Sequence, residues 1–453
     1  MKDLQQILFQ DKDASSLSFF RIVFGFMLTW EVCRYFYYGW IKTYWINPEF
    51  YFTYDFFHWV SPWPENLMYI HFFVLGVLAI FIALGLFYRL SIVLFFFGFT
   101  YIFLLDKANY LNHFYLISLV SFILIWLPAN AKYSIDAKLF KKTPSETVPY
   151  WAILAVQIQI GVAYFFGGIA KLNADWLNGE PMRDWLLDAK VAPLIGQLFV
   201  HPYAAYFFSY GGLLLDLFIV PFLLWKKTRI PAFITISTFH LLNANLFNIG
   251  IFPWFMIAAT TIYFNPAWVR RILQWVKLDE FGQLRTAPIY ALSSKNVITY
   301  SFIVYFLIQF IFPLRHHLIP GNANWTEEGH RYAWHMKLRQ KTAKARFKVV
   351  DNQSREVKEI NPRKELSKRQ YRKMSTRPDM ILQYAHHLTK KYNSTGEKHI
   401  SVYADVKASL NGREKQLLID PDVDLSKQQF SIFKNDWIVP LNTPLILTHA
   451  NAK

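Results

Sequence analysis

A series of long apolar segments with few charges is the strongest constraint on how this chain can fold. The clearest case is Trp151–Ala170, whose twenty residues include no Asp, Glu, Lys or Arg. About twenty apolar residues in a helix are enough to cross the hydrocarbon core of a bilayer. Similar blocks recur over residues 17–319, whereas residues 321–453 are polar. The pattern predicts a membrane protein with a polar C-terminal part.

The apolar blocks predict about nine transmembrane helices. Their expected bounds are Leu17–Tyr38, Leu67–Phe87, Leu90–Leu105, Phe114–Leu127, Trp151–Ala170, Tyr203–Leu224, Pro231–Leu246, Ile251–Phe264 and Val297–Phe312. Several are shorter than an ideal span, so they need flanking residues or a thin bilayer. The chain is 54% hydrophobic and 19% aromatic, which exceeds the soluble norm. The expected fold class is therefore a polytopic α-helical membrane protein.

Basic residues in the loops predict the orientation of the bundle. If the N-terminus is cytoplasmic, 13 Lys and Arg residues fall in cytoplasmic loops and 5 in the opposite loops. The positive-inside rule favours this arrangement. An odd number of spans then places the C-terminal part outside the cytoplasm. We expect a transmembrane bundle over residues 1–320 and an extracytoplasmic α+β domain over residues 321–453.

The patterning of the C-terminal part predicts a folded domain. Apolar residues at 380, 381, 384, 388 and 392 share one face of a helix. Residues 400–408 alternate between apolar and polar like a half-buried strand. Shorter strands are expected at residues 346–350 and 415–419.

The C-terminal part is also basic, with 25 Lys and Arg against 14 Asp and Glu. This charge is compatible with anionic lipid or an acidic peptide as partner, although charge alone favours a solubilising surface. It contains no nucleic-acid-binding motif. The pairs His316-His317 and His386-His387 lack metal-ligand spacing. We therefore expect neither a nucleic-acid partner nor a metal.

Lys171 directly follows the charge-free segment Trp151–Ala170. An ionisable group at the edge of a membrane span is a candidate functional residue. Lysines at helix ends also commonly extend toward the interface, and this segment alone leaves both interpretations open. Desolvation favours the neutral amine, which can act as a base.

Two further polar clusters are expected at the same end of the bundle as Lys171. Residues 106–113 join the third and fourth predicted spans, and residues 240–245 close the seventh. Each cluster alone has an ordinary structural explanation, such as a helix cap or a satisfied buried polar group. Their convergence favours a shared site that faces the bundle interior or a cavity.

Several stretches of the chain also match, in order and spacing, the motifs of one enzyme family. They are Phe103–Lys107 with Asn112-His113, Gly168–Trp176, Phe239–Gly250, Tyr332–Met336, Gln383–Ala385, Tyr392-Asn393 and Ile419–Pro421. Together they resemble the vitamin K-dependent γ-glutamyl carboxylase family over nearly the whole chain. The chain is shorter than the animal enzymes and lacks their extra C-terminal β domain and disulfide cysteines. The resemblance therefore implies a bacterial member, in the inner membrane, with its C-terminal domain in the periplasm.

The resemblance implies a reaction on exported proteins or peptides that contain glutamate. Vitamin K hydroquinone and O₂ together generate a base strong enough to remove a γ-hydrogen of glutamate. CO₂ then adds at that carbon, and the quinone leaves as its 2,3-epoxide. No metal is implied, and the oligomeric state stays open.

The resemblance also implies roles for individual residues. Lys171 corresponds to the base that deprotonates the hydroquinone, and His113 could hydrogen-bond a quinone oxygen or an oxyanion. The supporting cofactor-binding residues are Asn112, His240, Asn243, Trp334 and Met336. Tyr332 and Arg339 are candidates for binding the substrate, the latter by pairing with its carboxylate. His335, Lys337 and Arg339 replace the family's residues, so the selection of glutamate can differ.

Two alternatives to carboxylation stay open at this point. The first is a quinol epoxidase or oxidase without peptide carboxylation, because the quinone-side residues match the family better than the peptide-side residues. The second is a non-enzymatic membrane protein for binding or transport. The chain lacks the internal repeat that many transporters show.

Overall fold

A computed structural model describes residues 2–139, 145–188, 193–247, 249–275, 292–393 and 399–445. Each of the nine predicted apolar segments overlaps a helix in these ranges. Within the described ranges, five helical segments are long and apolar enough to cross a membrane: Ser15–Tyr37, Glu65–Leu84, Tyr150–Ile169, Ala204–Leu224 and Ser293–Leu318. Three shorter apolar helical segments are Tyr88–Leu104, Asn112–Trp126 and Phe252–Tyr263.

The long helices of the bundle are α2 (Ser15–Tyr37), α3 (Glu65–Leu84), α4 (Tyr88–Leu104), α5 (Asn112–Trp126), α7 (Tyr150–Ile169), α11 (Ala204–Leu224), α12 (Arg229–Leu246) and α15 (Leu292–Ile311). Short helices connect or flank them: α1 (Lys2–Leu8), η1 (Lys42–Ile46), η2 (Lys107–Asn109), α6 (Ile135–Leu139), α8 (Ala174–Leu177), α9 (Met182–Leu187), α10 (Pro193–Val200), α13 (Phe252–Ala259), η3 (Thr260–Tyr263), α14 (Pro266–Trp275) and η4 (Phe312–Leu318). Strands β1 (Asp11–Asp13) and β2 (Thr147–Pro149) pair antiparallel.

Helices α2 and α3 pack closely because α2 carries a glycine at their contact. A Cβ at Gly25 would lie 2.5 Å from the Ala83 nitrogen and 2.8 Å from the Ala79 oxygen. The buried Arg21, one turn earlier, donates hydrogen bonds to the carbonyls of Ile82 and Ala129 at 2.7 and 3.0 Å. The guanidinium therefore joins the C-terminal end of α3 to the loop that follows α5.

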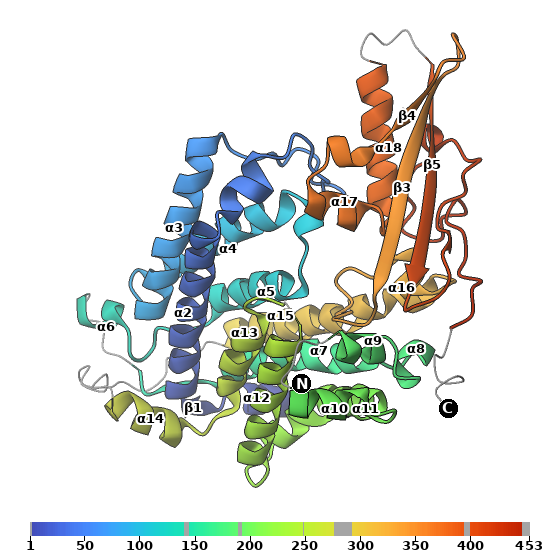
Figure 1. The fold of residues 1–453 in the computed structure, drawn as a ribbon. Coiled ribbons are helices and arrows are strands. Elements are labelled where there is room, and N and C mark those ends of the chain that lie inside the picture. The colour runs from blue at the N-terminus through green and yellow to red at the C-terminus, as the bar shows by residue number, and fades with distance from the viewer. Residues whose placement is uncertain are drawn as a thin grey trace.

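The C-terminal part is built around a four-stranded antiparallel sheet, which stands beside the bundle in Figure 1. The strand order is β4 (Val357–Ile360), β3 (Lys341–Asp351), β5 (Ile400–Leu410) and β6 (Gln416–Leu417). Helix α18 (Pro378–Tyr392) packs on this sheet, with the rings of Tyr384 and Phe347 5.0 Å apart. The remaining short helices are α16 (Ala323–Thr326), η5 (Pro362–Lys364), α17 (Lys368–Met374) and η6 (Leu425–Lys427). The predicted helical face therefore lies on α18, and the predicted strand over 400–408 lies within β5.

Loops of the bundle insert into the core of the C-terminal part. Phe52 and Ala108 are fully buried in the same cluster as the sheet residues. Asp106 accepts hydrogen bonds from the Ala108 nitrogen at 2.8 Å and from the Gln370 side chain of α17 at 3.0 Å. Asp106 does not pair with Lys107, which instead lies within 3.4 Å of Asp379. The first half of the predicted polar cluster at 106–113 thus joins the two parts of the chain.

A second contact between the parts uses a carboxylate from the predicted site motif. Asp175 on α8 receives two hydrogen bonds of 2.6 Å from the guanidinium of Arg413. Asn411 donates a third, at 2.7 Å. Bidentate pairs of this kind fix orientation as well as distance. Among the loop cations used to predict the topology, Lys141, Lys142, Lys190, Lys277 and Arg285 lie outside the described residues.

Replacing Gly25 by Ala is expected to destabilise the bundle by about 1–3 kcal/mol, because the added methyl overpacks the contact between α2 and α3. Gly211→Ala is the matched control, since a Cβ there would meet no atom within 4 Å. Thermal unfolding of the purified protein in detergent should show a lower midpoint for G25A and no loss for G211A. Equal midpoints for the two variants would contradict the packing argument.

Candidate functional site

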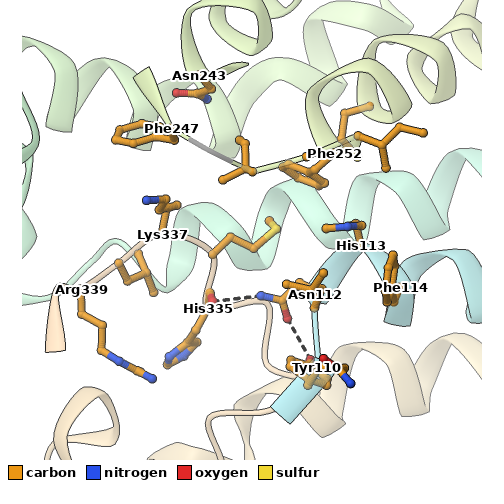
Figure 2. A pocket seen from close by; sticks show the side chains of 18 of the residues that line it. Tyr110, Asn112, His113, Phe114, Asn243, Phe247, Phe252, His335, Lys337 and Arg339 are labelled. Carbon is orange, nitrogen blue, oxygen red and sulfur yellow. Dashed lines mark hydrogen bonds between the residues drawn. The ribbon is translucent and has the colours of Figure 1, made fainter. Parts of the chain in front are cut away.

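A cavity of about 860 Å³ lies between the bundle and the C-terminal part. Helices α2, α5, α7, α11 and α12 contribute lining residues, as do helix α17 and residues 330, 331, 335–339 and 341. Figure 2 shows His113, Asn243 and Phe252 facing Lys337 and His335 across part of it. Of the sequence-predicted residues, those that line the cavity are Asn112, His113, Lys171, His240, Asn243, Met336 and Arg339.

Lys171 lies just beyond the end of α7 and is 5% exposed. Its Nζ donates hydrogen bonds to Asp216 Oδ2 at 2.6 Å and to the carbonyl of Gly167 at 3.0 Å. The Trp176 ring lies beneath it, 5.5 Å from Nζ to the ring centroid. The side chain is therefore held inside the protein by a carboxylate and does not extend to an interface.

Two glycines allow this arrangement. A Cβ at Gly168 would lie 2.7 Å from the side chain of Leu217 and 3.0 Å from its backbone nitrogen. A Cβ at Gly167 would lie 3.4 Å from Asp216 Oδ2 and 3.0 Å from Met336 Cε. Larger residues would separate α7 from α11 and would displace the acid from the lysine. The Gly-Gly pair is thus the local reason that the ion pair forms.

Two buried histidines line the bundle side of the cavity. His240 on α12 is 2% exposed, and its Nε2 is 2.8 Å from the hydroxyl of Tyr164. Its Nδ1 is buried and has no hydrogen-bond partner among the described residues. His113 on α5 packs against Phe114 and Phe252, with ring centroids 4.8 and 5.7 Å away. Buried polar groups are rarely left unsatisfied, so the Nδ1 of His240 is a candidate contact for a ligand.

The two asparagines differ in how much of their side chain is free. Asn112 accepts from the Tyr110 hydroxyl at 2.8 Å and donates to the carbonyl of His335 at 3.0 Å. These bonds are drawn in Figure 2. One N–H of the Asn112 amide thus remains for a ligand. The other N–H is bonded to the His335 carbonyl and positions the backbone at that residue. Asn243 lines the cavity from α12.

The segment from Tyr332 to Arg339 forms one side of the cavity through an unusual backbone. Tyr332, Trp334 and Lys337 have φ values of 63°, 59° and 49°, in a region that non-glycine residues seldom adopt. Such conformations persist only where the surrounding structure imposes them, and they concentrate at functional sites. Residues 335 to 339 line the cavity as a result.

Trp334 and Tyr332 do not line the cavity, in contrast to the roles that the sequence motif implies. Trp334 is 1% exposed, and its ring packs 5.2 Å from that of Tyr115. Tyr332 packs against Tyr110 and Tyr115 at 5.4 and 4.9 Å. Both rings lie on the α5 side of the segment because of its left-handed residues. Their contacts with α5 hold the segment in place on the side that faces away from the cavity.

Besides Arg331 and Lys337, six cations of the C-terminal part line the cavity. We call them the basic wall: Arg339, Lys341, Arg369, Arg372, Lys373 and Arg377. The buried Glu327 lies behind it and forms ion pairs with Arg339, Lys341 and Arg377. Although burial raises the pKa of Glu327, these cations hold it below its usual value. Arg339 therefore already has a carboxylate partner within the protein.

The positive charges of the other cations in the basic wall are less fully compensated by nearby carboxylates. In the described part of the chain, no carboxylate lies within ion-pair distance of Arg369, Arg372 or Lys373. The positive charge of Arg377, together with burial, holds the pKa of Lys373 well below its usual value. Burial lowers the pKa of Lys341 to about 7, against the opposing effect of Glu327. The cavity is thus prepared for an anionic ligand.

Asp216, Tyr164 and Glu327 are site residues that the sequence reasoning did not identify. Asp216 is the only charged residue in the span Tyr203–Leu224, so the rule that drew attention to Lys171 applied to it equally. Tyr164 and Glu327 give no such signal, because many other tyrosines and acids occur in the chain. No group of three His, Cys, Asp or Glu suited to hold a metal occurs within the described ranges.

Two family models match the chain. That of the HTTM domain matches residues 9–268, more than half of the chain. That of the vitamin K-dependent gamma-carboxylase lumenal domain matches residues 294–444. No solved structure matches the chain. The two matches follow each other along the chain, the second beginning within α15, and they confirm the family resemblance read from the motifs. The chain, with its apolar helices, belongs to the vitamin K-dependent gamma-carboxylase family of membrane proteins.

Proposed function

We propose that this protein carboxylates glutamate side chains of exported proteins or peptides, using vitamin K hydroquinone, CO₂ and O₂, with the 2,3-epoxide as second product. The observation that carries the proposal is the buried pair of Lys171 and Asp216 at a cavity whose opposite side is the basic wall. The pair offers a base for a weakly acidic hydroxyl, and the basic wall offers partners for a carboxylate. Both are needed for this reaction.

Lys171 is the proposed acceptor of the hydroquinone proton. The ammonium formed in this step is stabilised by Asp216 and by the Gly167 carbonyl, which also fix its direction. A base held by a further group is the usual arrangement in proton-transfer catalysis. The low exposure of the pair keeps water away from the reacting atoms.

The bundle side of the cavity fits an aromatic diol with an apolar body. Its lining includes Phe114, Phe252 and Met256 beside His113. The Nδ1 of His240, which has no hydrogen-bond partner in the described part of the chain, is suited to a quinone or hydroquinone oxygen. When bound, the hydroquinone would supply the electrons that reduce O₂. The chain's own contribution is to position the ring and to remove its proton.

The basic wall is the proposed binding site for the glutamate carboxylate. Arg369, Arg372 and Lys373 lack carboxylate partners among the described residues, so they are available to the substrate. Arg339 is held by Glu327 and would position the neighbouring cations. Met336 Cε lies 3.0 Å from where a Cβ on Gly167 would be, so the thioether side chain packs against α7 next to Asp216.

We further propose the topology that brings an exported substrate to the cavity. In it, nine helices cross the membrane, the N-terminus is cytoplasmic, and residues 321–453 lie outside, in a periplasm if the organism is bacterial. The five long apolar helices and the excess of basic residues in alternate loops support this arrangement. The two cores support a boundary near residue 320, although Phe52 and Ala108 belong to the core of the C-terminal part and Trp334 belongs to that of the bundle.

Epoxidation without carboxylation is the second candidate function. The pairing of Arg339 with Glu327 favours it, because that guanidinium is not free to bind a substrate carboxylate. A coupled assay decides between the two. Purified protein in nanodiscs would receive vitamin K hydroquinone, a glutamate peptide and labelled CO₂. Label in the peptide together with epoxide supports carboxylation, and epoxide alone supports the second candidate.

Lys171→Ala is expected to lower both epoxide and carboxylated peptide by about 10²–10⁴-fold, because the proposed base acts before either product forms. Added small amines should restore part of both activities. Lys42→Ala, which removes an exposed lysine from the same side of the bundle, should leave both rates unchanged. Failure of every amine to restore turnover in a folded K171A protein would argue against Lys171 as the base.

Met336→Ala and Trp334→Ala should have different effects, although the two residues are near neighbours in sequence. Met336 lines the cavity, so its loss should lower the ratio of carboxylated peptide to epoxide. Trp334 supports the segment from behind, so its loss should lower the thermal midpoint and leave that ratio unchanged. A normal product ratio for M336A would remove Met336 from the proposed site.

Lys373→Ala is expected to raise the KM for the glutamate peptide by about tenfold, since one charge-assisted contact is lost. Epoxide formation in the absence of peptide should not change. Lys390→Ala on the exposed side of α18 is the control, with both parameters as in the unmodified protein. An unchanged KM for K373A would place the carboxylate elsewhere.

A further inference from the structure

Four histidines lie in a row between the cavity and the surface. His316 and His317 belong to η4, and His330 and His335 belong to the loop between α16 and β3. The ring centroids are 4.6 Å apart for His330 and His335, 4.7 Å for His335 and His316, and 4.0 Å for His316 and His317. We call this row the histidine chain.

The two ends of the histidine chain lie in different environments. His330 and His335 line the cavity, and His335 is 8% exposed. His316 is half-buried and His317 is exposed, at the end of the candidate membrane span Ser293–Leu318. The row therefore joins the interior of the site to the outer face of the protein.

Gly329 brings the two segments of the histidine chain together. Its φ is +68°, and a Cβ there would lie 2.8 Å from both Cα and Cβ of His316. Any other residue would push the loop away from η4. The contact between the segments is thus built into the backbone.

The central ring of the histidine chain is unsatisfied. Both ring nitrogens of His335 are buried, and neither has a hydrogen-bond partner among the described residues. His316 directs Nδ1 to the Pro313 carbonyl at 2.8 Å. Because a carbonyl only accepts, Nδ1 of the neutral His316 ring carries the hydrogen and Nε2 is left as an acceptor. A rotation of His335 can therefore bring a donor nitrogen to an acceptor on its neighbour.

The charges around the histidine chain keep its inner rings neutral. Arg331, Arg339 and Arg377 face His330. The Nδ1 of His330 also lies 3.8 Å from the carboxylate of Glu327. Arg315 and Arg339 face His335. Burial first, and these cations second, hold the pKa of His330 and His335 well below the usual value. A neutral imidazole both donates and accepts, so it can pass a proton without storing it.

The proposed reaction, on which this inference rests, releases a proton inside an enclosed site. The γ-carbon of glutamate loses a proton and forms a bond to CO₂, which leaves one more carboxylate on the product. Oxidation of the hydroquinone to the epoxide reduces O₂, of which one atom enters the epoxide and the other leaves as water. This second half is neutral in protons, so each carboxylation leaves one proton to be removed.

We propose that the histidine chain carries this proton from the cavity to the outer face of the protein, in the order His330, His335, His316 and His317. His335 and His316 link the two halves of the relay, because each of them contacts a histidine ring on both segments. Lys171 and the basic wall bind and activate the substrates, whereas the histidine chain resets the protonation of the site after each turnover.

The test compares His335→Phe and His316→Phe in nanodiscs, with His386→Phe as control because His386 lies on α18, outside the histidine chain. Steady-state carboxylation should fall about tenfold or more in both chain variants. The first turnover, and epoxide formation without peptide, should stay at the level of the control. Added imidazole should restore the steady state.

Equal slowing of peptide-free epoxidation, or no effect of added imidazole in either variant, would overturn the relay. An unmodified protein that makes epoxide but no carboxylated peptide would overturn it as well, since no net proton is then released. That last result would contradict the proposed function by itself, so the two failures are distinguishable.

Discussion

The site depends on a lysine and an aspartate that are buried together between two apolar helices. Either charge alone would be costly at this position, whereas the pair with a good hydrogen bond is tolerated. The 2.6 Å bond between Lys171 and Asp216 forms because Gly167 and Gly168 let α7 approach α11. The cavity, its histidines and Met336 are arranged around this contact. The two glycines thus shape the cavity as well as the packing of α7 on α11.

The other side of the cavity comes from the C-terminal part, so the attachment of the two parts defines the site. Asp106 binds Gln370 of α17, the helix that carries much of the basic wall. Asp175 binds Arg413 through two hydrogen bonds, close to Lys171 in the chain. Residues from the bundle thereby fix where the cations stand relative to the lysine. Neither part alone contains a complete cavity.

Local patterns in the sequence predict the helices well, because long apolar segments and charges at their ends are visible without any partner. Lys171, His113 and His240 were found in this way, and all three line the cavity. Asp216 was visible by the same rule, but its pairing with Lys171 depends on how two distant segments pack. No local pattern contains that information. Asp106 shows the converse, because a polar residue that looked like part of the site serves to join the two parts.

The segment from residue 332 to 339 was the hardest to predict. Its motif is clear, yet the side on which each residue lies is set by left-handed φ values at Tyr332, Trp334 and Lys337. Large side chains give no warning of such conformations, which are more familiar at glycine and asparagine. Trp334 and Tyr332 were therefore expected in the cavity and are found behind it. Binary patterning fails wherever the backbone departs from helix or strand geometry.

The same backbone has a consequence for how this enzyme family can change over time. Residues 335 to 339 face the cavity while Tyr332 and Trp334 anchor the segment, so recognition and support are divided among neighbouring positions. Substitutions at the facing positions alter the chemistry offered to a ligand without disturbing the anchors. A single insertion or deletion, in contrast, would exchange facing residues for anchors and would abolish both roles at once. The segment is therefore expected to tolerate substitutions at the facing positions but not insertions or deletions.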